Sequence, residues 1–235
     1  MNTLLHQPHA IPVSLGWHCH VALFLQDLGD LEKRRYERNV FDWFGIPMWS
    51  ICDLLDRSFA DLTQRDLLKM RPRFTKKKDE ILSHLAYDIR FLHEFKTPVE
   101  SVSTEEWAAF EDKYKRRVER FQRLLDFSKA TGQKLLFVRM EQDLYEKIVY
   151  PEFEKPKEHD ELYYVKRFAD QMKERGVKFQ ILFFTSSFPG GYDAEHNLLS
   201  LRYTNAKPEI SVGADQMMMI LKANLPLVQR CLRLV

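Results

Sequence analysis

The stretch Ile11-Pro-Val-Ser-Leu-Gly-Trp-His-Cys19-His-Val-Ala-Leu-Phe-Leu-Gln26 decides how the rest of the chain is arranged. Its apolar run from Ile11 to Leu15 ends at Gly16, as a short buried strand ends at a turn. The apolar residues that follow predict a helix that stops near Gly29. Cys19 then falls in or near the helix's first turn, where unpaired N–H groups and the helix dipole stabilise a thiolate or a bound anion. The alternative is a small buried core residue, as free cysteines commonly are.

The composition describes a globular protein with no general affinity for nucleic acid. The chain has 235 residues, of which 45% are apolar, and a formal net charge of +2. Three widely spaced cysteines make no disulfide framework, so we expect a reducing compartment, the cytoplasm. The N-terminus lacks the pattern of a signal peptide, and no apolar run is long enough to cross a bilayer. Oligomeric state stays open.

No cofactor or metal is expected from the motifs. The eight glycines form neither a dinucleotide fingerprint nor a P-loop. His18, Cys19 and His20 offer metal-ligand side chains, but their spacing is too tight to chelate from one helix. Cys52 and Cys231 stand alone and are interpreted as core residues.

Strands and helices are expected to alternate along the chain. This order predicts one α/β domain over residues 1–235, with a mostly parallel sheet and helices on both faces, a three-layer, Rossmann-like arrangement. Residues 30–80 are a candidate helical insertion, with a helical pattern over Ser50–Leu68. The expected strands after the first one are Ile81–Phe95, Lys134–Arg139, Lys178–Phe184 and Asn197–Tyr203; the expected later helices are 104–131, 160–175 and 214–232.

In a parallel sheet, ligands bind outside the carboxyl ends of the strands. Three segments follow predicted strands, and His93 ends a fourth strand; the three segments are Gly16–Cys19, Arg139–Glu141 and Ser186–Gly191. We expect all four to converge on one edge, which makes Cys19 part of a site. Asp42 lies in the densely aromatic segment Val40–Trp49, where a carboxylate either holds a hydrogen-bonding role or caps a turn or a helix.

Three motifs resemble one family: Ser14-Leu-Gly-Trp-His-Cys19-His-Val-Ala, Phe41-Asp42-Trp43 and Tyr114-Lys-Arg116-Arg117-Val-Glu-Arg120-Phe121. They are similar, over roughly residues 11–140, to a family of mostly bacterial proteins labelled papain-like cysteine peptidases. The resemblance implies Cys19 as the nucleophile, His93 as the histidine that ends a strand, and Asp42 as the aspartate of its Phe-Asp-Trp element. It also implies an alternative fold, a papain-like α+β architecture, whereas the alternation of strands and helices favours the parallel sheet.

Three functions follow as hypotheses. The first is a cysteine-dependent hydrolase or acyl transferase acting on a peptide, a glycan or another small molecule, with Cys19 as nucleophile and His93 as base. Asp42 or Asp88 would orient the imidazole, and His18 or His20 is an alternative base. The second is an anion-binding transferase for a nucleotide sugar or glycan, and the third is a binding module without chemistry. The expected substrate-binding residues are Gly16, Trp17, His18, His20, Trp43, Arg116, Arg120 and Arg139.

Overall fold

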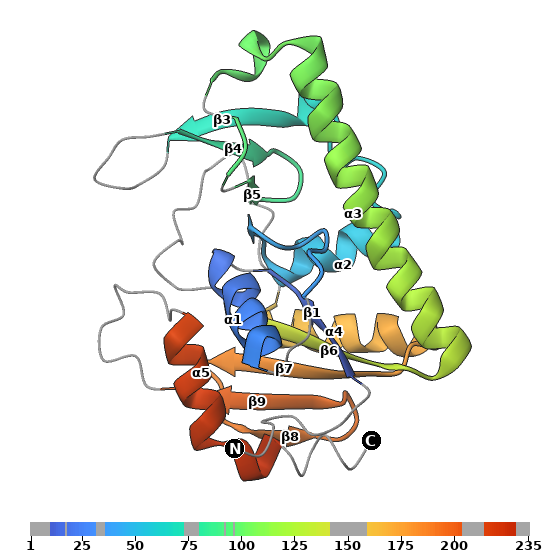
Figure 1. Ribbon diagram of the computed structural model, residues 1–235, viewed down its shortest axis with the longest axis vertical. Helices are drawn as coiled ribbons and strands as arrows, with labels where there is room; N and C mark the ends of the chain where they lie inside the picture. Colours follow the sequence, from blue (N-terminus) through green and yellow to red (C-terminus); the bar gives the residue numbers. More distant parts are fainter. Residues whose placement is uncertain are drawn as a thin grey trace.

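A computed structural model of the chain describes residues 10–16, 18–31, 36–72, 80–91, 93–95, 97–141, 159–203 and 214–228. A five-stranded sheet, sheet A, forms the lower half of a mixed α/β fold in Figure 1, with helices packed against it. Its order is β1-β6-β7-β9-β8; the first four of these strands are parallel and β8 is antiparallel at one edge. The predicted α/β class with a mainly parallel sheet is confirmed. The strands are β1 (Ala10–Ser14), β6 (Lys134–Met140), β7 (Phe179–Thr185), β8 (Gly191–Asp193) and β9 (Leu198–Arg202).

Helices pack on both faces of sheet A because its central strands are apolar on both sides. In β6, Leu135 and Phe137 join one apolar cluster with α2, α3 and α4, while Leu136 and Val138 join a second cluster with α1 and α5. Figure 1 shows α1 and α5 side by side. The helices are α1 (His18–Leu31), α2 (Met48–Asp56), α3 (Thr104–Thr131), α4 (Glu161–Glu174) and α5 (Ala214–Ala223).

A second, antiparallel sheet was not expected from the sequence. Sheet B has the order β2-β5-β4-β3, and its strands are β2 (Phe44–Gly45), β3 (Leu68–Pro72), β4 (Glu80–His84) and β5 (Ile89–Phe91). The single strand predicted over Ile81–Phe95 is wrong, because residues 85–88 form a turn that contains Asp88 in the left-handed region at φ 48°. His93 follows β5 of sheet B, so the expectation that it ends a strand of the parallel sheet is also wrong.

The segment predicted as a helix over Ser50–Leu68 contains a shorter helix, because α2 ends at Asp56. Ser58 and Phe59 take positive φ values of 52° and 60°, which no α-helix accommodates. Turns and a short 3₁₀ helix, η1 (Arg65–Leu67), lead into β3. Residues 30–80 therefore contain strands β2 and β3 as well as helix α2.

Helix α3 runs from sheet B to sheet A along one side of the molecule (Figure 1). A 3₁₀ turn, η2 (Val99–Ser101), precedes it. Its N-cap is Ser103, whose side chain accepts from the backbone of Glu106 while the Glu106 carboxylate accepts from the backbone of Ser103. Gly132 ends the helix at φ 72°, as predicted.

The last predicted helix, 214–232, begins as expected, but α5 ends at Ala223, and its predicted end beyond residue 228 lies outside the described residues. Across the described ranges, no helix is both long and apolar enough to cross a bilayer.

Candidate active site

Cys19 is the second residue of α1, at the carboxyl edge of sheet A. Strand β1 ends at Ser14, Leu15 still donates to the Val138 carbonyl at 2.9 Å, and the helix begins at His18. The Cys19 side chain is half-buried, and no acidic residue lies in the first turn of α1 to oppose a thiolate.

Cys52 provides the contrast within the same chain. It is fully buried on α2, its thiol lies 3.5 Å from the Tyr164 carbonyl, and burial raises its pKa to about 12. A thiol in this state is inert as a nucleophile. Within the described residues, neither Cys19 nor Cys52 forms a disulfide, and Cys231 lies outside the described residues.

The turn before α1 packs against the Phe-Asp-Trp segment. Gly16 has φ +74°, and a Cβ there would lie 2.7 Å from the Cγ2 atom of Ile46 and 3.2 Å from the Phe41 carbonyl oxygen. The Ser14 hydroxyl accepts from the Gly16 N–H at 3.0 Å and closes the turn. Two of the three motifs singled out in the sequence are therefore in direct contact, and only glycine fits between them.

Asp42 holds the second of these motifs in shape. Its carboxylate is fully buried and accepts from the Tyr36 hydroxyl at 2.8 Å and from the Asn39 N–H at 2.9 Å. Burial raises its pKa to about 6, although these hydrogen bonds and the nearby charge of Arg117 lower it in part. The Asn39 side chain in turn accepts from the Phe41 N–H at 2.9 Å. The carboxylate thus stabilises the loop that meets Gly16.

Trp43 and His93 are brought together by the two segments. Their rings meet edge to face with centroids 5.1 Å apart, and Trp43 takes φ 69°. His93 is exposed. Within the described part of the chain, its ring contacts Trp43 and hydrogen-bonds to neither Cys19 nor Asp42. Asp88, the alternative residue to orient the imidazole, lies in the β4–β5 turn. One of its carboxylate oxygens is 3.9 Å from the Arg90 guanidinium.

The three predicted arginines have different surroundings. Arg139 is fully buried and donates to the Leu15 and Ile46 carbonyls at 2.8 and 2.9 Å and to Glu161 at 2.8 Å. The Arg120 guanidinium donates to the Arg38 carbonyl. Arg116 is exposed and pairs with Asp112 on its own helix. Arg139 and Arg120 are thus engaged in holding the fold around the candidate site.

The remaining predicted residues flank Cys19. His20 is half-buried, and burial lowers its pKa, which favours the neutral imidazole. His18 begins α1, but its side chain is not described, and Trp17 lies outside the described residues.

Glu141 lies in one of the segments expected at the edge of the sheet, but no role was predicted for its side chain. Its Oε2 atom accepts from the Thr185 hydroxyl at 2.8 Å and from the backbone N–H groups of Ser186 and Ser187 at 2.7 and 3.1 Å. Glu141 therefore ties the end of β6 to the loop after β7. An acid directly after a buried strand was the signal that was available.

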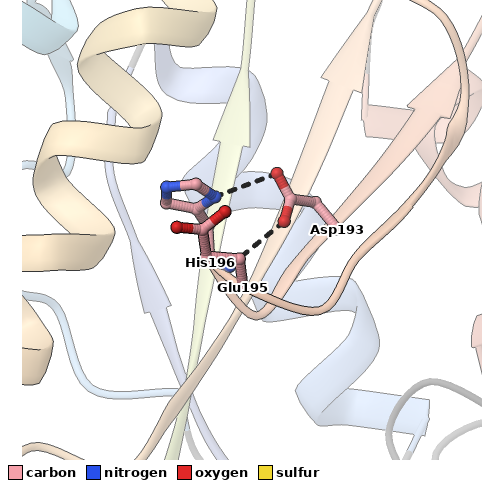
Figure 2. A group of neighbouring side chains, drawn as sticks. All are labelled: Asp193, Glu195 and His196. Carbon is pink, nitrogen blue, oxygen red and sulfur yellow. Dashed lines mark hydrogen bonds and ion pairs between the residues drawn. The ribbon is translucent and has the colours of Figure 1, made fainter.

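Asp193, Glu195 and His196 form a group with metal-ligand side chains in the β8–β9 turn (Figure 2). Lys166 already pairs with Asp193 at 2.9 Å, and the His196 ring bonds the same carboxylate at 2.9 Å. Burial alone would raise the pKa of Asp193, but these contacts outweigh it and hold the pKa at about 2. The Lys166 ammonium group therefore already balances the charge of the Asp193 carboxylate. The group is typical of a surface ion pair.

Comparisons with known proteins show which family the chain belongs to. A family model described as "Putative papain-like cysteine peptidase (DUF1796)" matches residues 11–187. "Uncharacterized protein R408" of Acanthamoeba polyphaga mimivirus is 31% identical over 143 residues, which cover 55% of this chain. The chain spans about 60% of the length of that relative. No solved structure matches the chain. Because the model covers most of the chain, including Cys19, Asp42 and His93, the protein belongs to this family of putative papain-like cysteine peptidases.

Proposed function

We propose that the protein is a cysteine-dependent hydrolase or acyl transferase in which Cys19 is the nucleophile. The observation that carries the proposal is the half-buried Cys19 thiol in the first turn of α1, after a turn built by two family motifs. The dipole of α1 favours the thiolate at that position. Membership of a family labelled cysteine peptidase supports the same chemistry.

In the proposed reaction, a histidine imidazole takes the Cys19 thiol proton, the sulfur attacks an acyl carbon, and a C–S bond forms; the bond between that carbon and the leaving group then breaks. Backbone N–H groups at the start of α1 stabilise the developing oxyanion. An imidazolium donates its proton to the leaving group, and water or a second acceptor then cleaves the thioester. Arg139 and Asp42 act as positioning residues, because both hold the segments around Gly16.

We propose His93 as the base, since the Trp43 ring positions it beside the Phe-Asp-Trp segment. Catalytic hydrogen bonds are often loose before substrate binds, and His93 then closes on Cys19 in the complex. His20 is the second candidate for the base, because burial keeps its imidazole neutral and able to accept a proton.

We also propose that residues 1–235 form one three-layer, Rossmann-like domain that works on a peptide, glycan or other small acyl substrate. The two cysteines that the structure describes form no disulfide, which supports a reducing compartment such as the cytoplasm.

Alkylation of single cysteines tests the nucleophile. We expect iodoacetamide to modify Cys19 in the folded protein at pH 7 and to leave Cys52 unmodified, because the Cys52 thiol is buried and stays protonated. Peptide mass mapping measures the two rates in one sample. Rapid alkylation is lost in the Cys19→Ala variant and is retained in a Cys52→Ala variant.

Equal slow labelling of Cys19 and Cys52 contradicts the nucleophile. For the base, His93→Gln and His20→Gln variants are compared by the pH profile of Cys19 labelling and by the rate of thioester hydrolysis. Loss of hydrolysis in His20→Gln with full activity in His93→Gln reassigns the base to His20.

A further inference from the structure

The indole N–H of Trp43 has no hydrogen-bond acceptor within the described part of the chain, although its nitrogen is buried. Buried indole N–H groups usually find a partner, because a buried donor without an acceptor is costly. Trp43 belongs to the segment that packs against the turn before α1, so its unpaired donor calls for an acceptor that a ligand supplies.

The backbone of Trp43 adds a second observation. Its φ of 69° places a bulky residue in the left-handed region, which is unfavourable without glycine. The buried Asp42 network and the Phe44 N–H bond to the Phe41 carbonyl at 3.3 Å hold the turn in this form. Strain of this kind persists where the surrounding structure over-determines it, and it is concentrated at ligand sites.

Arg38 supplies a second donor group at the same ring. Its guanidinium carbon lies 5.5 Å from the Trp43 ring centroid, and the residue is exposed. Among the described residues, no carboxylate pairs with this guanidinium, whereas the neighbouring Glu37 lies 3.8 Å from Arg120. The Arg38 backbone is anchored, because its carbonyl accepts from Arg120.

We propose that Trp43 and Arg38 form the recognition site for an acyl substrate that carries a carboxylate, as an N-acyl amino acid or a peptide C-terminus does. The ligand carboxylate draws the exposed Arg38 side chain off the ring and pairs with its planar fork. The Trp43 N–H then donates to the carbonyl oxygen of the ligand. This proposal rests on the cysteine chemistry proposed above, for which it names the substrate class.

Binding is measured in the full-length Cys19→Ala protein, so that it does not depend on the nucleophile. The chain has four tryptophans, and Trp43→Phe identifies the Trp43 indole signal in ¹H–¹⁵N spectra. If that variant fails to fold, the proximity of the Trp43 and His93 rings provides the assignment through proton–proton contacts.

We expect N-acetylglycine to shift the Trp43 indole signal in a saturable way. N-acetylglycinamide, which keeps the acyl group and lacks the carboxylate, binds more weakly by about fivefold or more, the value of one net hydrogen bond. Arg38→Gln removes the difference between the two probes. Arg123→Gln is the matched control, because Arg123 is an exposed arginine that already lies 3.9 Å from the Glu119 carboxylate on its own helix, and this variant leaves both affinities unchanged.

An unmoved Trp43 signal, or equal affinity for both probes, overturns the recognition site. Inorganic phosphate that shifts the signal as strongly as N-acetylglycine shows a general anion site and overturns the acyl carboxylate class. Absence of rapid Cys19 labelling in the wild-type chain, with N-acetylglycine binding intact, would instead remove the proposed function and leave a carboxylate-binding site.

Discussion

At the scale of single residues, Asp42 links burial to pH dependence. Its pKa in the folded protein is about 6, against 3.8 for an unperturbed aspartate, so the folded state binds more protons than the unfolded state between these values. The free energy of unfolding therefore falls as pH rises from about 4 to about 6. A shift of about two units corresponds to about 3 kcal/mol for this fully buried group. We expect Asp42→Asn to remove this pH dependence of the free energy of unfolding, measured by urea unfolding between about pH 4 and pH 6.

Asp193→Asn is the control for Asp42. The pKa of Asp193 is lowered to about 2, so its stabilisation is present above pH 4 and is lost as pH falls toward 2. This variant lowers the free energy of unfolding by a constant amount above pH 4, keeps the slope between pH 4 and 6, and changes the slope only below pH 4. The same slope in wild type and Asp42→Asn would contradict a raised pKa at Asp42.

At the scale of elements, the turn between β1 and α1 depends on a glycine in close contact. Gly16→Ala combines the left-handed penalty of about 1–2 kcal/mol with overpacking against Ile46 of about 1–3 kcal/mol. Gly132 has nearly the same φ, +72°, but no atom of the described residues lies within 4 Å of the position that a Cβ would take there. Both variants carry the left-handed penalty, but only Gly16→Ala adds overpacking against Ile46. We therefore expect Gly16→Ala to lower the free energy of unfolding by about 1–3 kcal/mol more than Gly132→Ala does, as measured by thermal and urea unfolding.

The same pair of variants separates packing from chemistry. Gly16→Ala also displaces the start of α1 and slows Cys19 alkylation in the folded protein, whereas Gly132→Ala leaves the alkylation rate unchanged. Equal destabilisation by the two variants would show that the Phe41–Ile46 segment yields to the new methyl group.

At the scale of the whole molecule, Arg139 joins three parts of the fold. Its guanidinium binds the carbonyl after β1, the carbonyl after β2 and the first residue of α4. Arg139→Met leaves Glu161 without its cation and two carbonyls without a donor, so we expect a loss of about 3–5 kcal/mol in urea unfolding. Arg116→Met, at an exposed pair, changes stability by at most about 1 kcal/mol.

The double variant Arg139→Met/Glu161→Gln tests the cause of that loss. Neutralising Glu161 removes the buried unpaired charge, so part of the stability returns. If Arg139→Met is no more destabilising than Arg116→Met, the proposed role of Arg139 in joining the three parts is wrong.

The sequence by itself determined the elements whose signals are local. Strand β6, the length of α3 and its end at Gly132 follow from apolar periodicity and from a residue that tolerates positive φ. The position of Cys19 in the first turn of α1 follows from the same local reasoning, because a strand, a glycine turn and a helix are written in one continuous stretch.

Only the tertiary structure decided which segments meet. Sheet B pairs β2 with β5, which are more than forty residues apart in the sequence. The turn at Asp88 splits the strand predicted over Ile81–Phe95, and the apolar pattern of the sequence does not reveal this turn. The burial of Arg139 depends on contacts with residues that are far apart in the sequence, among them Leu15, Ile46 and Glu161. Residue type and spacing report a local preference, whereas burial and pairing are properties of the packed chain, and this is why His93 lies beside Trp43 rather than at the edge of sheet A.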